Sequence, residues 1–71
     1  MRFSFDPTVN ALYIELRDAE VTTTIEIREG VLADFDQNRD LVGIEILDER
    51  LFFDFLRQND GELSIPEKMT A

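Results

Sequence analysis

Apolar and polar residues alternate along five short runs between residues 2 and 47. An alternation with a period of two places every second side chain on the same face of a strand, so each run predicts a β-strand with one buried face. The predicted strands are Arg2–Asp6, Ala11–Arg17, Val21–Arg28, Val31–Asp36 and Leu41–Leu47. Turn-forming residues such as Asp6-Pro7 and Glu29-Gly30 separate them. Short links favour an antiparallel meander in which consecutive strands pair.

The alternation also predicts which side chains face inward, because a shift of one residue would move a whole strand's apolar set to the other face. The predicted inner face holds Phe3, Phe5, Leu12, Ile14, Leu16, Val21, Thr23, Ile25, Ile27, Val31, Ala33, Phe35, Val42, Ile44 and Ile46.

After Leu47 the period changes from 2 to 3.6, which predicts a helix. Asp48 is a suitable N-cap residue, and Asn59-Asp60-Gly61 ends the helix after Gln58. The apolar stripe of this helix consists of Leu51, Phe52, Phe55 and Leu56. We expect Phe52, Phe55 and Leu56 to pack on the inner face of the sheet, because these are the two large apolar surfaces of the chain.

These elements predict an α+β fold: a small antiparallel β-meander of about five strands followed by one C-terminal α-helix packed on the sheet. The 71 residues are short enough for a single domain. We assign this domain to residues 1–61 and expect residues 62–71 to form a loose C-terminal tail.

A helix is only about 10–12 Å across, so one short helix leaves part of a five-stranded sheet uncovered. A small domain without disulfides or metal often gains stability by associating with itself. We therefore predict a dimer or small oligomer. The candidate interface residues lie on the polar phase of the sheet or off the helix stripe. They are Tyr13, Leu32, Leu41, Leu47 and Phe53.

The charge balance bears on possible partners. The chain has 16 acidic and 7 basic residues, a net charge of −9. Such a surface repels nucleic-acid phosphates and anionic lipids, so neither nucleic acid nor membrane is an expected partner. A basic protein is an alternative partner, as for the acidic half of a toxin–antitoxin pair. No signal peptide or membrane-spanning apolar run is apparent, which predicts a cytoplasmic protein.

Three segments of the sequence resemble a known family. They are Phe5-Asp6 leading to Ala11-Leu12-Tyr13-Ile14, then Gly30-Val31 with Asp34, and finally Leu41-Val42-Gly43-Ile44-Glu45-Ile46-Leu47-Asp48. Together they are similar to a family of short prokaryotic proteins catalogued as domain of unknown function 2283, over about residues 3–50. The resemblance implies a compact antiparallel sheet followed by a helix, and it brings no established activity, cofactor or catalytic residue.

The sequence departs from the pattern of that family at three positions. Phe5 replaces the usual tyrosine, Asn10 the usual aspartate, and Arg39 the glycine that is common in the fourth turn. A turn that needs a positive φ angle accepts glycine most readily. We therefore expect Asn38 to adopt the left-handed conformation in place of Arg39.

One spacing points to a metal site. Asp34, Asp36, Asn38 and Glu45 match the ligand positions of an EF-hand calcium loop, but Arg39 occupies the position that requires glycine. The flanking segments are predicted strands rather than helices. We interpret the segment as a hairpin with acidic turn residues and predict no cofactor, and a divalent-cation site on these four residues is an alternative.

Catalytic machinery is not apparent in the sequence. Histidine and cysteine are absent, and no residue near Thr22-Thr23-Thr24 is a suitable base for a nucleophile. The three glycines are dispersed, so they form no phosphate-binding loop. We therefore predict a non-catalytic, self-associating protein-interaction module. The alternatives are an acidic neutralising partner of a basic protein and a divalent-cation-binding protein.

Overall fold

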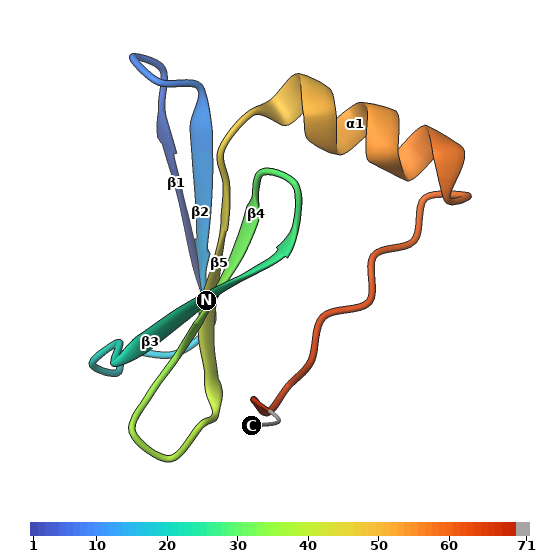
Figure 1. Cartoon of the computed structure of the whole chain (residues 1–71). Helices are drawn as coiled ribbons and strands as arrows, with labels where there is room; N and C mark the ends of the chain where they lie inside the picture. Colours follow the sequence, from blue (N-terminus) through green and yellow to red (C-terminus); the bar gives the residue numbers. More distant parts are fainter. Residues whose placement is uncertain (70–71) are drawn as a thin grey trace.

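The computed structural model of the chain, which describes residues 1–69, contains a five-stranded antiparallel sheet and one helix (Figure 1). The elements are β1 (Arg2–Asp6), β2 (Ala11–Glu15), β3 (Thr23–Arg28), β4 (Val31–Phe35), β5 (Leu41–Ile46) and α1 (Glu49–Gln58). The predicted α+β fold class is confirmed. The predicted strand limits differ from the observed ones by only one or two residues, at the ends of four strands.

The strand order in the sheet is β1-β2-β5-β4-β3, so one pairing differs from the strictly sequential one. β2 pairs with β5 rather than with β3. The link of residues 16–22 is long enough to carry the chain to the far edge of the sheet, where β3 pairs with β4. β5 thus occupies the central position, and Val42, Ile44 and Ile46 on this strand are all buried. A central strand is the most protected place for so apolar a segment.

The register of the strands confirms the predicted inward phase. Ile44 lies opposite Ile14 of β2 on one side and Ala33 of β4 on the other. Residues that are directly opposite in an antiparallel pair share a face. The buried apolar residues are Ala11, Val31, Ala33, Phe35, Val42, Ile44 and Ile46. All of them except Ala11 belong to the predicted inner face, so the core is centred on β4 and β5.

The helix begins as predicted but covers less of the sheet than expected. Asp48 caps it by accepting a hydrogen bond from the Arg50 backbone N–H, and none of its residues is fully buried. Phe52 packs against the core cluster of the inner face, whereas Phe55 and Leu56, which were also expected there, are not part of that packing. Since the link from β5 to α1 is so short, the helix starts at the end of the sheet and extends away from it (Figure 1).

Instead, Phe55 of the helix contacts Arg28, the last residue of β3 before the β3–β4 turn. The Arg28 guanidinium lies 5.0 Å from the centroid of the Phe55 ring, which is the geometry of a cation–π contact. Over residues 1–69, no helix has the length and apolar character needed to cross a membrane.

The segment after the helix covers part of the inner face of the sheet that α1 leaves open. Leu63 and Ile65 pack against the core cluster of Val31, Ile44 and Ile46. The segment then follows the β4–β5 turn, where the Leu41 N–H donates to the Glu67 carbonyl at 2.9 Å and the Met69 N–H donates to the Arg39 carbonyl at 2.8 Å.

These contacts differ from the loose tail predicted for residues 62–71. The sequence after Gly61 has no regular pattern that would indicate the packing of Leu63 and Ile65 on the inner face. Thr70 and Ala71 lie outside the described residues.

The β4–β5 turn also differs from its prediction in one detail. Arg39 itself adopts the left-handed conformation, with a φ angle of 67°, and Asn38 does not. The Arg39 N–H donates to the Asp36 carbonyl at 3.0 Å, and this bond fixes the turn around Arg39. Asn10, at another departure from the family pattern, likewise has a positive φ angle of 59°.

Candidate functional site

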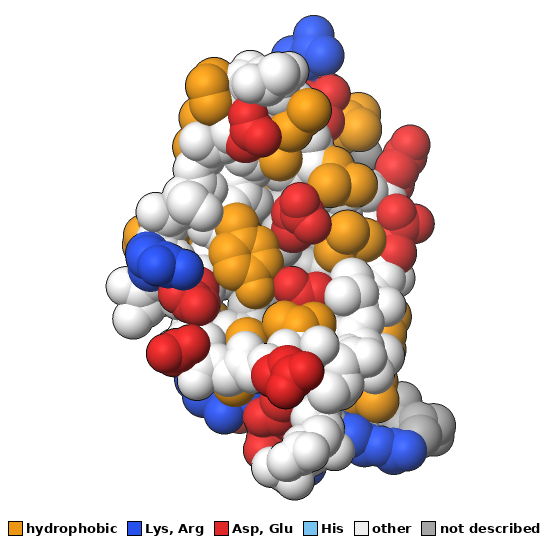
Figure 2. All heavy atoms as spheres, turned by 90° about the vertical axis from the view of Figure 1, so that its left-hand side faces the viewer, with side chains coloured by type: hydrophobic (Ala, Val, Ile, Leu, Met, Phe, Trp, Pro, Cys, Tyr) orange, Lys and Arg blue, Asp and Glu red, His pale blue; other side chains and the backbone are white. Residues whose placement is uncertain are grey.

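The outer face of the sheet, turned away from the helix, carries acidic side chains interspersed with apolar ones (Figure 2). A hydrogen-bonded cluster on this face joins three strands. The Tyr13 hydroxyl of β2 donates to Oδ2 of Asp34 on β4 at 3.1 Å. The Thr24 hydroxyl of β3 donates to Oδ1 of the same carboxylate at 2.6 Å. We call Tyr13, Thr24 and Asp34 the outer-face cluster.

Gly43 makes this cluster possible. β5 lies between β2 and β4, so the Tyr13 side chain must cross β5 to reach Asp34. A Cβ atom at position 43 would overlap the Tyr13 hydroxyl and would lie 2.9 Å from the Ile14 carbonyl oxygen. A glycine within a strand commonly marks such a close approach. The Tyr13, Asp34 and Gly43 positions of the sequence pattern therefore form one structural unit.

The surroundings of Tyr13 raise the pKa of its hydroxyl to about 12. Partial burial is the largest cause, followed by the hydrogen bond to Asp34 and by the negative charges of Asp34, Glu15 and Glu45. Each of these disfavours the phenolate. At neutral pH Tyr13 is thus a protonated hydrogen-bond donor, and the cluster holds this proton tightly instead of supplying a phenolate nucleophile.

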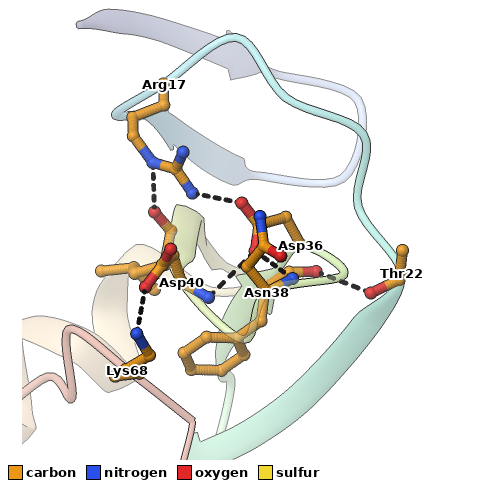
Figure 3. A network of polar contacts seen from close by, with 8 residues as sticks. Arg17, Thr22, Asp36, Asn38, Asp40 and Lys68 are labelled. Carbon is orange, nitrogen blue, oxygen red and sulfur yellow. Dashed lines mark hydrogen bonds and ion pairs between the residues drawn. The ribbon is translucent and has the colours of Figure 1, made fainter.

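A second polar network surrounds Asp36, the residue directly after β4 (Figure 3). Arg17 donates to its Oδ2 at 2.7 Å, and the backbone N–H groups of Asn38 and Asp40 donate to its Oδ1 at 2.9 and 3.0 Å. Hydrogen bonds from Arg17 and from these backbone groups lower the pKa of the carboxyl. Lys68 forms an ion pair with Asp40 at 3.2 Å, which ties the C-terminal segment to the same turn.

Three of the four candidate calcium ligands belong to these two networks, and Glu45 belongs to neither. Asp34 accepts hydrogen bonds on the outer face, while Asp36 accepts bonds that shape the turn containing Asn38. Glu45 lies on β5 opposite Tyr13 and Leu32. Within residues 1–69 no three acidic side chains are grouped as metal ligands. The spacing therefore does not bring Asp34, Asp36 and Glu45 together as a group.

The predicted interface residues fall into two groups. Tyr13, Leu32 and Leu41 are partly buried, whereas Leu47 and Phe53 are exposed by 40% and 52%. The structure does not gather these five side chains into one patch: Phe53 is on the helix and Tyr13 is in the outer-face cluster.

Sequence reasoning missed a more prominent apolar surface. The alternation placed Phe3 and Phe5 of β1 together on the apolar face of the sheet, and in the structure they are exposed by 61% and 47%. Their phase was correct, since they lie opposite Ile14 and Leu12 of β2. β1 is an edge strand on which neither the helix nor the C-terminal segment packs. The small size of the predicted helix was the signal that part of this face would be left uncovered.

Comparison with protein families assigns the chain to one of them. The profile of a family described as protein of unknown function, DUF2283, matches residues 2–50. The chain belongs to this family. The match to the DUF2283 profile spans all five strands and the start of α1, and it includes every residue of the outer-face cluster. No match was found among curated proteins or among solved structures.

Proposed function

We propose that this DUF2283 protein is a non-catalytic interaction module that associates with itself. The observation that supports the proposal is the exposed pair Phe3 and Phe5, which continues the apolar inner face to the edge of the sheet. Contiguous apolar side chains on the surface of a small protein commonly mark a protein-binding site.

The energy available from this surface sets the expected affinity. Covering the exposed half of one phenylalanine removes on the order of 100 Å² from water, which is worth about 2.5 kcal/mol at about 25 cal/mol per Å². Four such rings would contribute at most roughly 10 kcal/mol if a dimer covered them completely. Association costs about 4–15 kcal/mol in lost freedom. The net gain is therefore small, and the dimer should be of modest affinity, visible at micromolar to millimolar concentrations.

Light scattering coupled to size exclusion, over a dilution series, tests the proposal. We expect a mass above the 8.3 kDa of one chain that declines on dilution. The double substitution Phe3→Thr and Phe5→Thr should abolish association, because threonine suits a strand and removes the rings. Phe53→Thr is the matched control, since Phe53 is exposed to a similar extent, by 52%, but is on the helix. A single-chain mass at millimolar concentration would contradict self-association, and loss of association only in the Phe53 variant would move the interface to α1.

A second candidate function, the binding of a basic protein, is favoured by the net charge of −9. Acidic side chains are prominent on the outer face, opposite the helix (Figure 2). Charge complementarity accelerates association and selects partners. A tagged protein used as bait in a cell lysate should then retain a strongly basic protein that salt elutes. Recovery of chaperones alone would argue against this function.

A further inference from the structure

We propose that two copies of the chain pair through their β1 strands, antiparallel and within one continuous sheet, with Ser4 on the two-fold axis. The inference rests on the proposed self-association and specifies its interface. Three observations carry it: the contrast between the two sheet edges, the order of charges along β1, and the position of its two phenylalanines.

The two edges of the sheet differ in how they are protected. β3, at one edge, has an irregular register between Glu26 and Arg28. A bulge with charged side chains is a common device against unwanted strand pairing. β1, at the other edge, pairs with β2 in an unbroken register over all five of its residues. Among the described residues no segment covers the outer side of the β1 backbone, so this side offers a row of unpaired peptide groups.

The side chains of β1 are complementary to a reversed copy of themselves. When Ser4 faces the partner's Ser4, Arg2 lies opposite the partner's Asp6, and Asp6 opposite the partner's Arg2. Opposite charges that face each other across two strands stabilise the pair. The Arg2 side chain is 75% exposed and contacts Glu15 of its own chain at 3.0 Å, so it has room to contact a second carboxylate.

The same register also pairs the exposed rings. Phe3 lies opposite the partner's Phe5, on the inner face of both copies. Aromatic cross-strand pairs are among the favourable ones. A register shifted by two residues in either direction leaves part of β1 without a strand partner, and Pro7, just after the strand, has no N–H to extend the ladder. The Ser4-centred register is the one in which every residue of β1 is paired.

Cysteine substitution tests this geometry directly, because the chain has no cysteine of its own. Across an antiparallel pair the Cα atoms of directly opposite residues are about 4.5–5.5 Å apart, within the range that a disulfide spans. Ser4→Cys should therefore yield a disulfide-linked dimer on mild oxidation at concentrations where the wild type is associated. Glu26→Cys, at an exposed position of the opposite edge strand, is the control and should remain mostly monomeric on a non-reducing gel.

The outcomes separate the pairing mode from the proposed function. If the wild type is a dimer in solution but the Ser4→Cys variant forms no cross-link, β1 pairing is overturned and self-association stands. The same conclusion follows if the Ser4→Cys and Glu26→Cys variants cross-link equally. A wild-type chain that remains a monomer at every concentration would overturn self-association itself.

A charge exchange provides an independent test. Arg2→Glu alone and Asp6→Arg alone each place like charges opposite each other in the homodimer, so each should weaken self-association about tenfold. In an equimolar mixture of the two variants, the glutamate introduced into one copy faces the arginine introduced into the other. The unchanged Asp6 of the first copy then faces the unchanged Arg2 of the second. The mixture should therefore associate more tightly than either variant alone. A mixture that associates no better than its components would contradict the Ser4-centred register.

Discussion

At the scale of single residues, the outer face is organised by side chains that span neighbouring strands. Tyr13 crosses over Gly43 to reach Asp34, and Thr24 approaches the same carboxylate from the far edge of the sheet. The cluster therefore links β2, β4 and β3 by side chains, in addition to the backbone ladders. Its position on a partly buried surface makes the protonation of Tyr13 a sensitive reporter of the folded state.

Tyr13 is the single tyrosine of the chain, so its titration can be followed by tyrosinate absorbance without interference. We expect a midpoint at about pH 12 in the folded protein and at 10.0 in denaturant. Because the pKa is higher in the folded state, the contribution to the free energy of unfolding is complete below pH 10.0 and is lost as the pH rises towards 12. Tyr13→Phe should lack this alkaline loss in thermal melts. A native midpoint near the denatured value would show that the contact with Asp34 is absent in solution.

Arg39 is a second residue whose conformation makes a measurable prediction. Its φ angle of 67° lies in the left-handed region, which costs a residue with a Cβ about 1–2 kcal/mol. Its two backbone hydrogen bonds, with the Asp36 carbonyl and the Met69 N–H, do not require its side chain. Arg39→Gly should therefore raise the free energy of unfolding by roughly 0.5–1 kcal/mol, after the greater flexibility of glycine in the unfolded chain is subtracted. Chemical denaturation measures this change, and Arg39→Ala, which keeps the strain, should show no gain.

At the scale of elements, the strands and the start of the helix could be predicted because each depends on a local pattern. The alternation placed Ile44 and Ile46 inward, and Asp48 marked the helix start. The remaining features depend on contacts between distant segments. The insertion of β5 between β2 and β4 and the packing of Leu63 and Ile65 on the core have no local signal. The outer-face cluster likewise required the strand order, since Tyr13 and Asp34 are 21 residues apart.

The orientation of β5 can be tested with two neighbouring positions. Ile44 is 6% exposed on the inner face, and Glu45 is on the outer face next to it. Ile44→Asp would bury an unpaired charge and should unfold the chain, because a small domain has only a few kcal/mol to lose. Glu45→Ala should change the free energy of unfolding by about 0.5 kcal/mol or less, as is usual for surface positions. Thermal melts that rank the two variants in the opposite order would mean that the register of β5 is wrong by one residue.

At the scale of the whole molecule, the apolar edge and the net charge act in opposite directions. The exposed rings of β1 favour association, whereas two copies that each carry a charge of −9 repel each other. The radius of gyration is 12.2 Å, so the centres of two paired copies lie well within the reach of this repulsion at low salt. There the Debye length is about 30 Å at 0.01 M, compared with about 8 Å at 0.15 M.

The salt dependence of binding follows from this balance and separates the two candidate functions. Raising the ionic strength from about 0.01 M to about 0.15 M screens the repulsion between two acidic copies, so self-association should become tighter. Screening also weakens the attraction within the Arg2–Asp6 pairs. This loss should be the smaller effect, because there are only two such contacts, whereas the repulsion comes from the net charge of the whole molecule. A complex with a basic protein is held by opposite charges and should weaken over the same range.

Sedimentation equilibrium at both ionic strengths measures the change in self-association. If the self-association constant instead falls as salt is added, the specific charge pairs outweigh the net repulsion. In that case Arg2 and Asp6 contribute a larger share of the dimer's stability than the rings of Phe3 and Phe5.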